Sequence, residues 1–108
     1  MQKPVTTKQK TVTITSTTET TILDAVAGAY VDLASIVIAN SSATGVTLSV
    51  RDATGGSVMK TWYVPPTDTR GMVFSIPFEQ KTLNKNWTIQ SSVAVTSLFV
   101  TTQGFVRS

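Results

Sequence analysis

Short apolar runs separated by small polar turns recur along the chain, and this pattern restricts it to β-structure. In residues 46–51, VTLSVR, apolar and polar side chains alternate strictly, which is the period of a strand with one buried face. The turns beside it, NSSATG and DATGG, are built from residues that accept turn conformations or bond their own backbone. About eight such strands at intervals of about 8–12 residues predict an all-β fold, an antiparallel β-sandwich or jelly roll.

The composition favours the same fold. Charged residues make up only 14% of the chain, well below the usual quarter, and Thr, Ser and Val take their place. Branching at Cβ suits Thr and Val to a pleated surface. The best helical candidate, ILDAVAGAY, is short and contains Gly28. The 108 residues suffice for one sandwich core and no second domain.

The apolar pattern changes parity inside the longest predicted strand, YVDLASIVIAN. Val31 and Leu33 share one parity before Ser35, whereas Ile36 and Ile38 share the other after it. This change predicts either a β-bulge near Ser35 or a strand that is buried on both faces.

The first ten residues differ in charge from the rest. Lys3, Lys8 and Lys10 carry three positive charges without an acidic residue among them, while the remaining chain has six basic and six acidic residues. Val12 and Ile14 alternate weakly in the polar stretch TVTITSTTETT. We therefore expect residues 1–20 to form an extended basic arm, ordered only where it pairs, and residues 21–108 to form the sandwich domain.

The arm has several possible roles. It is either a solvated terminus or a segment that lies on an acidic protein surface or on nucleic acid. It is also suited to pair, as an exchanged strand, with the edge of a neighbouring subunit. Of these, a protein partner is expected and direct nucleic-acid binding is not.

The chain lacks the residues of common catalytic and metal sites. It contains no His and no Cys, which excludes imidazole bases, thiolate nucleophiles and sulfur-ligated zinc. The acids are scattered singly: Glu19, Asp24, Asp32, Asp52, Asp68 and Glu79. Asp52 is interpreted as a turn residue, not a metal ligand. We predict no enzyme activity, no catalytic residues, no metal site and no cofactor.

Four aromatic residues are candidates for exposed contacts. Trp62 and Tyr63 lie in TWYVPP, where either ring suits stacking on a sugar. Phe78 and Trp87 flank a long predicted loop and would serve there as interface anchors. For each of them, packing in the core or at a sheet edge is the alternative.

From about residue 20 to the C-terminus the chain resembles the small β-sandwich structural proteins of tailed bacteriophages, the capsid decoration and minor virion proteins. The resemblance lies in the order of four segments, which are TTILDAVAGAYVDLASIVIANSSATGVTLSVRDATGG, TWYVPP, GMVFSIPFEQ and VTTQGFV. None of them is a catalytic signature.

The resemblance implies a virion structural protein, a capsid decoration (cement) or minor capsid protein. Such proteins usually form oligomers, often trimers, on a capsid or tail lattice, so it implies a homotrimer bound to the major capsid protein or another virion protein. The alternatives are a tail or neck component and a carbohydrate-binding receptor-recognition module. The N-terminus has no apolar signal region and no run of 18 apolar residues exists, so we expect assembly in the host cytoplasm, a location in the virion and no membrane partner.

Overall fold

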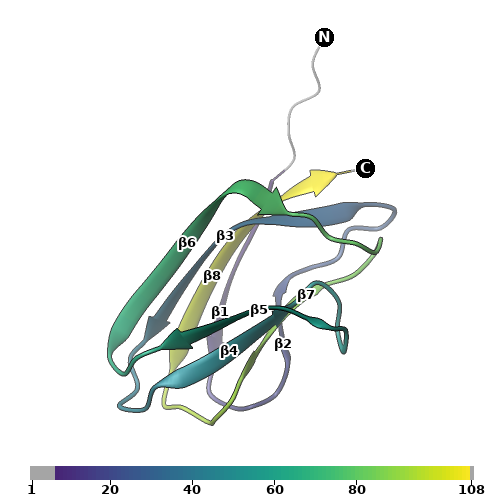
Figure 1. Ribbon diagram of the computed structural model, residues 1–108. Coiled ribbons are helices and arrows are strands. Elements are labelled where there is room, and N and C mark those ends of the chain that lie inside the picture. The colour runs from purple at the N-terminus through teal and green to yellow at the C-terminus, as the bar shows by residue number, and fades with distance from the viewer. Residues whose placement is uncertain (1–6, 108) are drawn as a thin grey trace.

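In the computed structural model, residues 7–107 are described, and so are their side chains except those of residues 70–77. The strands are β1 (Thr7–Ile14), β2 (Thr20–Leu23), β3 (Tyr30–Asn40), β4 (Val46–Arg51), β5 (Val58–Val64), β6 (Asp68–Phe78), β7 (Trp87–Ser91) and β8 (Leu98–Arg107). They form two four-stranded sheets, with strand orders β1-β8-β3-β6 and β2-β7-β4-β5. The two sheets face each other as a sandwich (Figure 1).

The strands pair as a long hairpin that has been rolled up. The antiparallel pairs β1–β8, β2–β7, β3–β6 and β4–β5 are nested, so the first strand meets the last and the innermost pair is joined by a turn. The additional pairs β3–β8 and β4–β7 close each sheet. This is the topology of a jelly roll. The predicted all-β sandwich of about eight strands is confirmed.

Alternating side chains supply the core between the sheets. In β4, Val46, Leu48 and Val50 are each at most 1% exposed, while Thr47 points to solvent, as the alternation predicts. Trp87 on β7 is fully buried. Burying a side chain of this kind contributes about 1.5–3 kcal/mol, so such positions supply most of the stability of a fold without disulfides.

A bulge lies in β3, which is the first of the two alternatives that the parity change near Ser35 left open. The registers of β3 with β6 and with β8 both shift between Leu33 and Ser35. Because of the shift, Val31 and Leu33 before it and Ile36 after it are all buried. The next residue, Val37, points outward and is 44% exposed.

Part of the predicted N-terminal arm forms a strand of the sandwich. β1 pairs with β8 of the same chain through eight consecutive residues, from Thr7 opposite Phe105 to Ile14 opposite Leu98. Ile14 is 2% exposed and belongs to the core. Lys3 lies outside the described residues.

Candidate interaction surfaces

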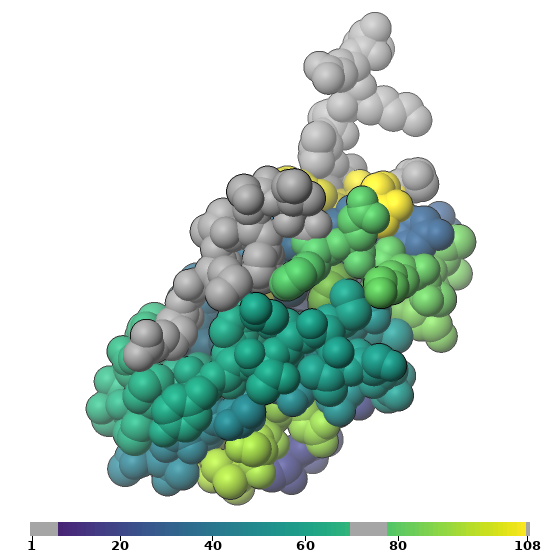
Figure 2. All heavy atoms as spheres, viewed as in Figure 1, coloured from purple at the N-terminus to yellow at the C-terminus, as the bar shows by residue number. Residues whose placement is uncertain are grey.

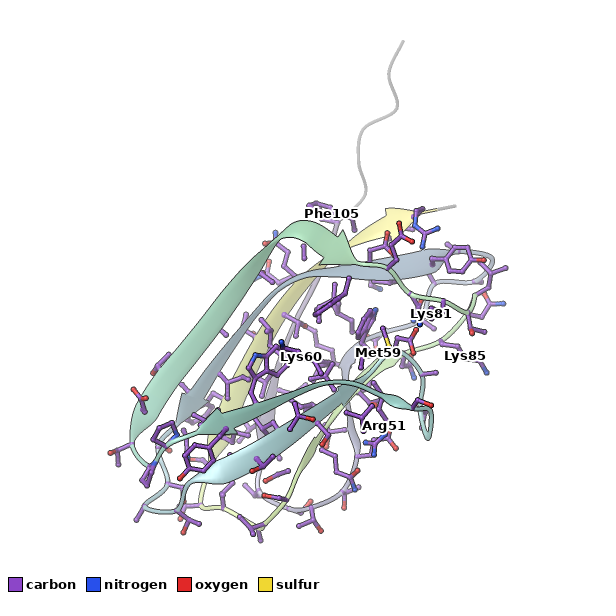
Figure 3. The ribbon with its side chains drawn as sticks, viewed as in Figure 1. Arg51, Met59, Lys60, Lys81, Lys85 and Phe105 are labelled. Atoms are coloured by element: carbon purple, nitrogen blue, oxygen red, sulfur yellow. The ribbon has the colours of Figure 1, made fainter. Side chains whose placement is uncertain are left out.

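The outer face of the β1-β8-β3-β6 sheet lacks charged side chains over most of its described area. Its outward residues are Thr7, Gln9, Thr11 and Thr13 on β1, Ser35, Val37 and Ala39 on β3, and Phe99, Thr101, Gln103 and Phe105 on β8. We call this set the uncharged face; Figure 3 labels Phe105 at one end of it. Val37 and Phe99 are 44% and 43% exposed, so two large apolar side chains contact solvent here.

An ion pair closes one end of the uncharged face. Asp32 is 8% exposed and accepts hydrogen bonds from Arg107 Nε at 2.8 Å and Arg107 Nη2 at 3.1 Å. The Arg107 guanidinium also lies 4.3 Å from the centre of the Tyr30 ring. The hydrogen bond to Asp32 raises the pKa of Arg107. The pair fixes the end of β8 to the start of β3.

A buried amide joins the loops at this end. Gln80 is 2% exposed; its Oε1 accepts from Val31 N at 2.8 Å, and its Nε2 donates to the carbonyl oxygens of Asp52 and Lys85 at 2.9 and 2.6 Å. Asp52 in turn accepts from Lys81 N at 3.0 Å. The Asp52 carboxylate therefore bonds the backbone of the neighbouring 79–86 loop, whereas the sequence interpretation had it bond the backbone of its own turn. The loops 52–57 and 79–86 lie side by side in the space-filling view (Figure 2).

The outer face of the other sheet carries a polar network centred on Glu19. Its carboxylate accepts from Thr88 Oγ1 at 2.5 Å and from Gly55 N at 2.9 Å. These two hydrogen bonds, that of Thr88 first, lower the pKa of Glu19 below its ordinary value. The contacts connect the segment between β1 and β2 to β7 and to the β4–β5 turn.

A second chain of hydrogen bonds crosses the same face. Arg51 donates from Nε to Gly56 O and from Nη1 to Gln90 Oε1, both at 2.9 Å. Gln90 Nε2 donates to Thr17 O at 3.1 Å. Because both ends of the Gln90 amide are held, its side chain has one orientation on the sheet.

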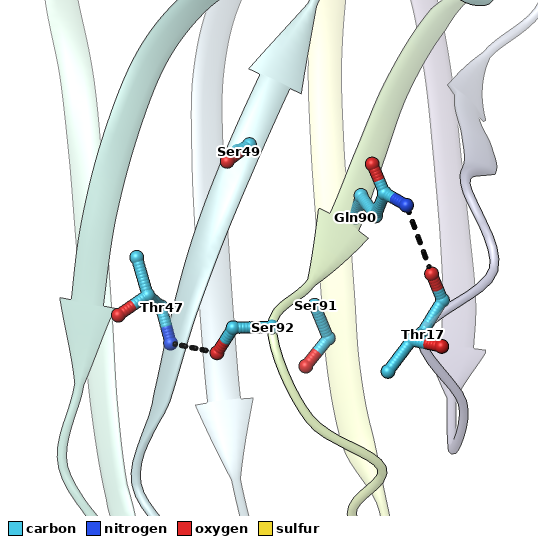
Figure 4. Close-up of a pocket in the computed structure, with 6 residues that line it drawn as sticks. All are labelled: Thr17, Thr47, Ser49, Gln90, Ser91 and Ser92. Carbon is cyan, nitrogen blue, oxygen red and sulfur yellow. Dashed lines mark hydrogen bonds between the residues drawn. The ribbon is translucent and has the colours of Figure 1, made fainter.

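A shallow recess lies beside these hydrogen bonds, between the first half of β4 and the end of β7 (Figure 4). Its lining residues are Thr17, Thr47, Ser49, Gln90, Ser91 and Ser92, and its volume is about 290 Å³. Ser92 Oγ accepts from Thr47 N at 3.1 Å and fixes one wall. Every lining side chain is polar and uncharged. The recess is therefore suited to a neutral ligand with many hydrogen-bonding groups.

The candidate aromatic contacts occupy different environments. Trp87 is fully buried and donates from Nε1 to Val31 O at 2.5 Å, so it does not provide the exposed contact that the sequence suggested. Trp62 and Phe78 are half-buried and pack against the core. Tyr63 alone of the four is exposed, at 62%.

The lysines of the predicted arm lie on the inward side of an edge strand. Lys8 and Lys10 alternate with the outward threonines of β1, and Lys10 Nζ lies 2.9 Å from Asp24 Oδ1. Lys60 on the edge strand β5 is similar: it pairs with the buried Val50 and so faces inward (Figure 3). Inward charges of this kind hinder pairing of a free strand edge with another chain.

Sequence reasoning missed the exposed apolar residues of the uncharged face. The signal was present, because Phe99 has the opposite parity to Leu98 and Val100 in the sequence LFVTT. Strict alternation around a buried pair places such a residue on the solvent side.

Metal-binding clusters and membrane-spanning helices are both absent from the described part of the chain. Among residues 7–107, apart from the side chains of 70–77, no group of three or more His, Cys, Asp or Glu residues is placed to hold a metal ion. In the same part of the chain, no helix has the length and apolar character to cross a membrane.

No family model matches the sequence, and no curated protein matches it. Solved structures share the fold, among them the following three. A chain of the cyanophage Pam1 capsid asymmetric unit aligns with a TM-score of 0.54 and 14% identity, over 94% of this chain and 84% of that chain. A chain from Bacillus endospore appendages, a family of disulfide-linked pili, aligns with a TM-score of 0.54 and 17% identity, over 98% and 93%. PirA aligns with a TM-score of 0.53 and 17% identity, over 90% and 92%. At these identities the likeness concerns the fold alone.

Proposed function

We propose that this protein is a structural component of a bacteriophage particle, a capsid decoration or minor capsid protein that acts as an oligomer and has no enzyme activity. The uncharged face carries the proposal. In a fold that is shared with a chain of a cyanophage capsid, this face offers a broad surface on which Val37 and Phe99 are both more than 40% exposed. A second copy of the chain covers it, and the oligomer binds the capsid lattice.

The charge distribution supports a second copy as the occupant. Charged residues at the rim, Asp32 and Arg107, already neutralise each other, so the face offers no charge for an oppositely charged partner to match. An uncharged face with two exposed apolar side chains suits an equally uncharged surface of a second copy. Because a two-fold contact alone gives a dimer, the trimer expected by resemblance requires the face of one copy to contact a different part of the next.

The placement of the acids supports a non-enzymatic role. Asp32 binds Arg107, Asp52 binds loop backbone and Glu19 binds Thr88 and Gly55. Each of these carboxylates is occupied by a separate structural contact, and no His is available as a base. The spore appendage proteins of similar fold are disulfide-linked, whereas this chain has no Cys, which favours non-covalent assembly.

The oligomeric state tests the proposal. Light scattering of the purified chain should give about 35 kDa for a trimer of the 11.6-kDa chain. Phe99→Lys and Val37→Lys should give the monomer, because each would bury an unpaired charge at the contact. Thr61→Lys is the matched control, since it adds the same charge to an exposed position on the other sheet and should leave the oligomer intact.

Two outcomes would overturn the proposal. One is a monomer at millimolar concentration; the other is equal loss of the oligomer in the control variant. Antibody labelling of the particles of the phage that carries the protein then separates the capsid from the alternatives. Label on heads supports a decoration or minor capsid protein, whereas label on necks or tails indicates a structural component of the neck or tail.

A further inference from the structure

We propose that the recess on the β2-β7-β4-β5 sheet, together with Tyr63, binds a neutral sugar unit of a glycan. This site lies on the sheet opposite to the uncharged face, so it goes beyond the assembly role and does not depend on it. The proposal is based on an uncharged recess lined by hydroxyl groups and on the neighbouring Tyr63, the one exposed residue among the four candidate aromatics.

Tyr63 is the cross-strand neighbour of one lining residue of the recess. It pairs with Thr47, a lining residue, across β4 and β5, and residues paired in this way have neighbouring side chains on one face. The ring extends over Gly45, because a Cβ at Gly45 would come within 2.8 Å of Tyr63 Cζ. Gly45, which directly precedes β4, thus leaves room for the ring, and the Tyr63 side chain remains 62% exposed and available for stacking.

The recess presents hydrogen-bonding groups in fixed positions. Gln90 is held by Arg51 and by Thr17 O, and Ser92 is held by Thr47 N. Within the described part of the chain, the side-chain hydroxyls of Thr17, Thr47 and Ser49 make no hydrogen bond, so each is free to donate to and accept from a ligand. Figure 4 shows these groups around the recess.

The chemistry of the site selects a neutral ligand with hydroxyls and an apolar face. The lining includes no charged residue, and the nearby Arg51 and Glu19 already bind protein groups. A pyranose ring has both required features: hydroxyls for the recess and an apolar CH face for Tyr63. A volume of about 290 Å³ is at the small end for ligand sites and suits one sugar ring, whose affinity is then weak, with a Kd on the order of 1 mM.

The experiment is an amide NMR titration of the full chain with the methyl glycosides of glucose, galactose and N-acetylglucosamine. At least one should shift the amides of Thr47, Ser49, Gln90 and Ser92 in a saturable way. Tyr63→Ala should weaken binding at least tenfold, while Tyr63→Phe should retain it because the ring remains. Ser49→Val should weaken binding as well, by removing a hydroxyl and filling the recess.

Phe99→Ala is the matched control, since it truncates another exposed aromatic side chain, on the other sheet, and should leave sugar binding unchanged. The amide spectrum of each variant reports whether it is folded. The inference is overturned if no glycoside shifts these amides at 100 mM, if the shifts lie elsewhere, or if Tyr63→Ala binds as well as Phe99→Ala. Phe99 variants should lose the oligomer but still bind sugar, whereas Tyr63→Ala should lose sugar binding but keep the oligomer. These opposite results separate the sugar site from the assembly role.

Discussion

Gln80 holds three segments together from a buried position. Its amide bonds β3 through Val31 N, the 52–57 loop through Asp52 O, and its own loop through Lys85 O. Because the residue is 2% exposed, water cannot easily replace these partners when the amide is removed. The side chain thus fixes the end of the sandwich on which both loops lie.

We predict that Gln80→Ala lowers the free energy of unfolding by about 2–4 kcal/mol, because it leaves a buried N–H and two carbonyls without their partner. Urea denaturation followed by fluorescence measures the change. Gln103→Ala, at an exposed strand position, should change stability by less than about 0.5 kcal/mol. Equal effects of the two substitutions would contradict the role given to Gln80.

Glu19 makes the stability depend on pH. Its hydrogen bonds from Thr88 and Gly55 lower its pKa in the folded chain below the ordinary value of 4.5. A lowered folded pKa means that the carboxylate stabilises the fold above pH 4.5, and that this contribution is lost as the pH falls through the folded pKa. In Glu19→Gln, the loss of stability between pH 7 and pH 3 should be smaller than in the parent chain. Denaturant midpoints at the two pH values test this, and an unchanged difference would refute it.

At the scale of single strands, β1 shows why part of the fold was predictable and part was not. The alternation of residues 46–51 predicted β4, and the parity change at Ser35 predicted either the bulge that β3 contains or burial of both faces, because local patterning reports directly which side is buried. The inward side of β1 carries Lys8 and Lys10, so polar residues occupy both of its faces. Its hydrophobic signal is confined to Val12 and Ile14, and its place in the sheet depends on β8, which begins 84 residues after Ile14.

Ile14→Ala tests whether β1 is part of the fold. We predict a loss of about 2–5 kcal/mol, the usual cost of such a truncation in a core, because Ile14 is 2% exposed. Thr13→Ala, one residue away on the outward side, should cost less than about 1 kcal/mol. Near-neutral effects of both substitutions would indicate an arm outside the core. If β1 is instead exchanged between subunits, the denaturation midpoint of the parent chain should rise with protein concentration. Pairing of β1 within one chain leaves that midpoint constant.

At the scale of the whole molecule, both candidate surfaces are products of topology. The recess joins Thr17, Ser49 and Gln90, which come from three separate parts of the chain and which no sequence motif connects. The uncharged face joins the first strand, the third and the last. Composition indicated surfaces without catalytic chemistry, but only the nested pairing of strands determines which hydroxyls and which aromatics share a face.

The same topology requires slow folding. β8 lies between β1 and β3 in its sheet, so this sheet cannot form completely until β8 pairs with β1. Folds with mostly non-local pairing of this kind have folding times of about milliseconds to seconds or longer. The fully buried Trp87 provides the fluorescence signal, because it is the only tryptophan that remains in the Trp62→Phe variant. Stopped-flow fluorescence of this variant should report a single refolding phase in that range. A chain that ends at residue 97 should not acquire the buried Trp87 signal at all, since β1 and β3 then lack the strand that joins them. Refolding within microseconds, or a native signal from the shortened chain, would mean that the two sheets form independently of the β1–β8 pair.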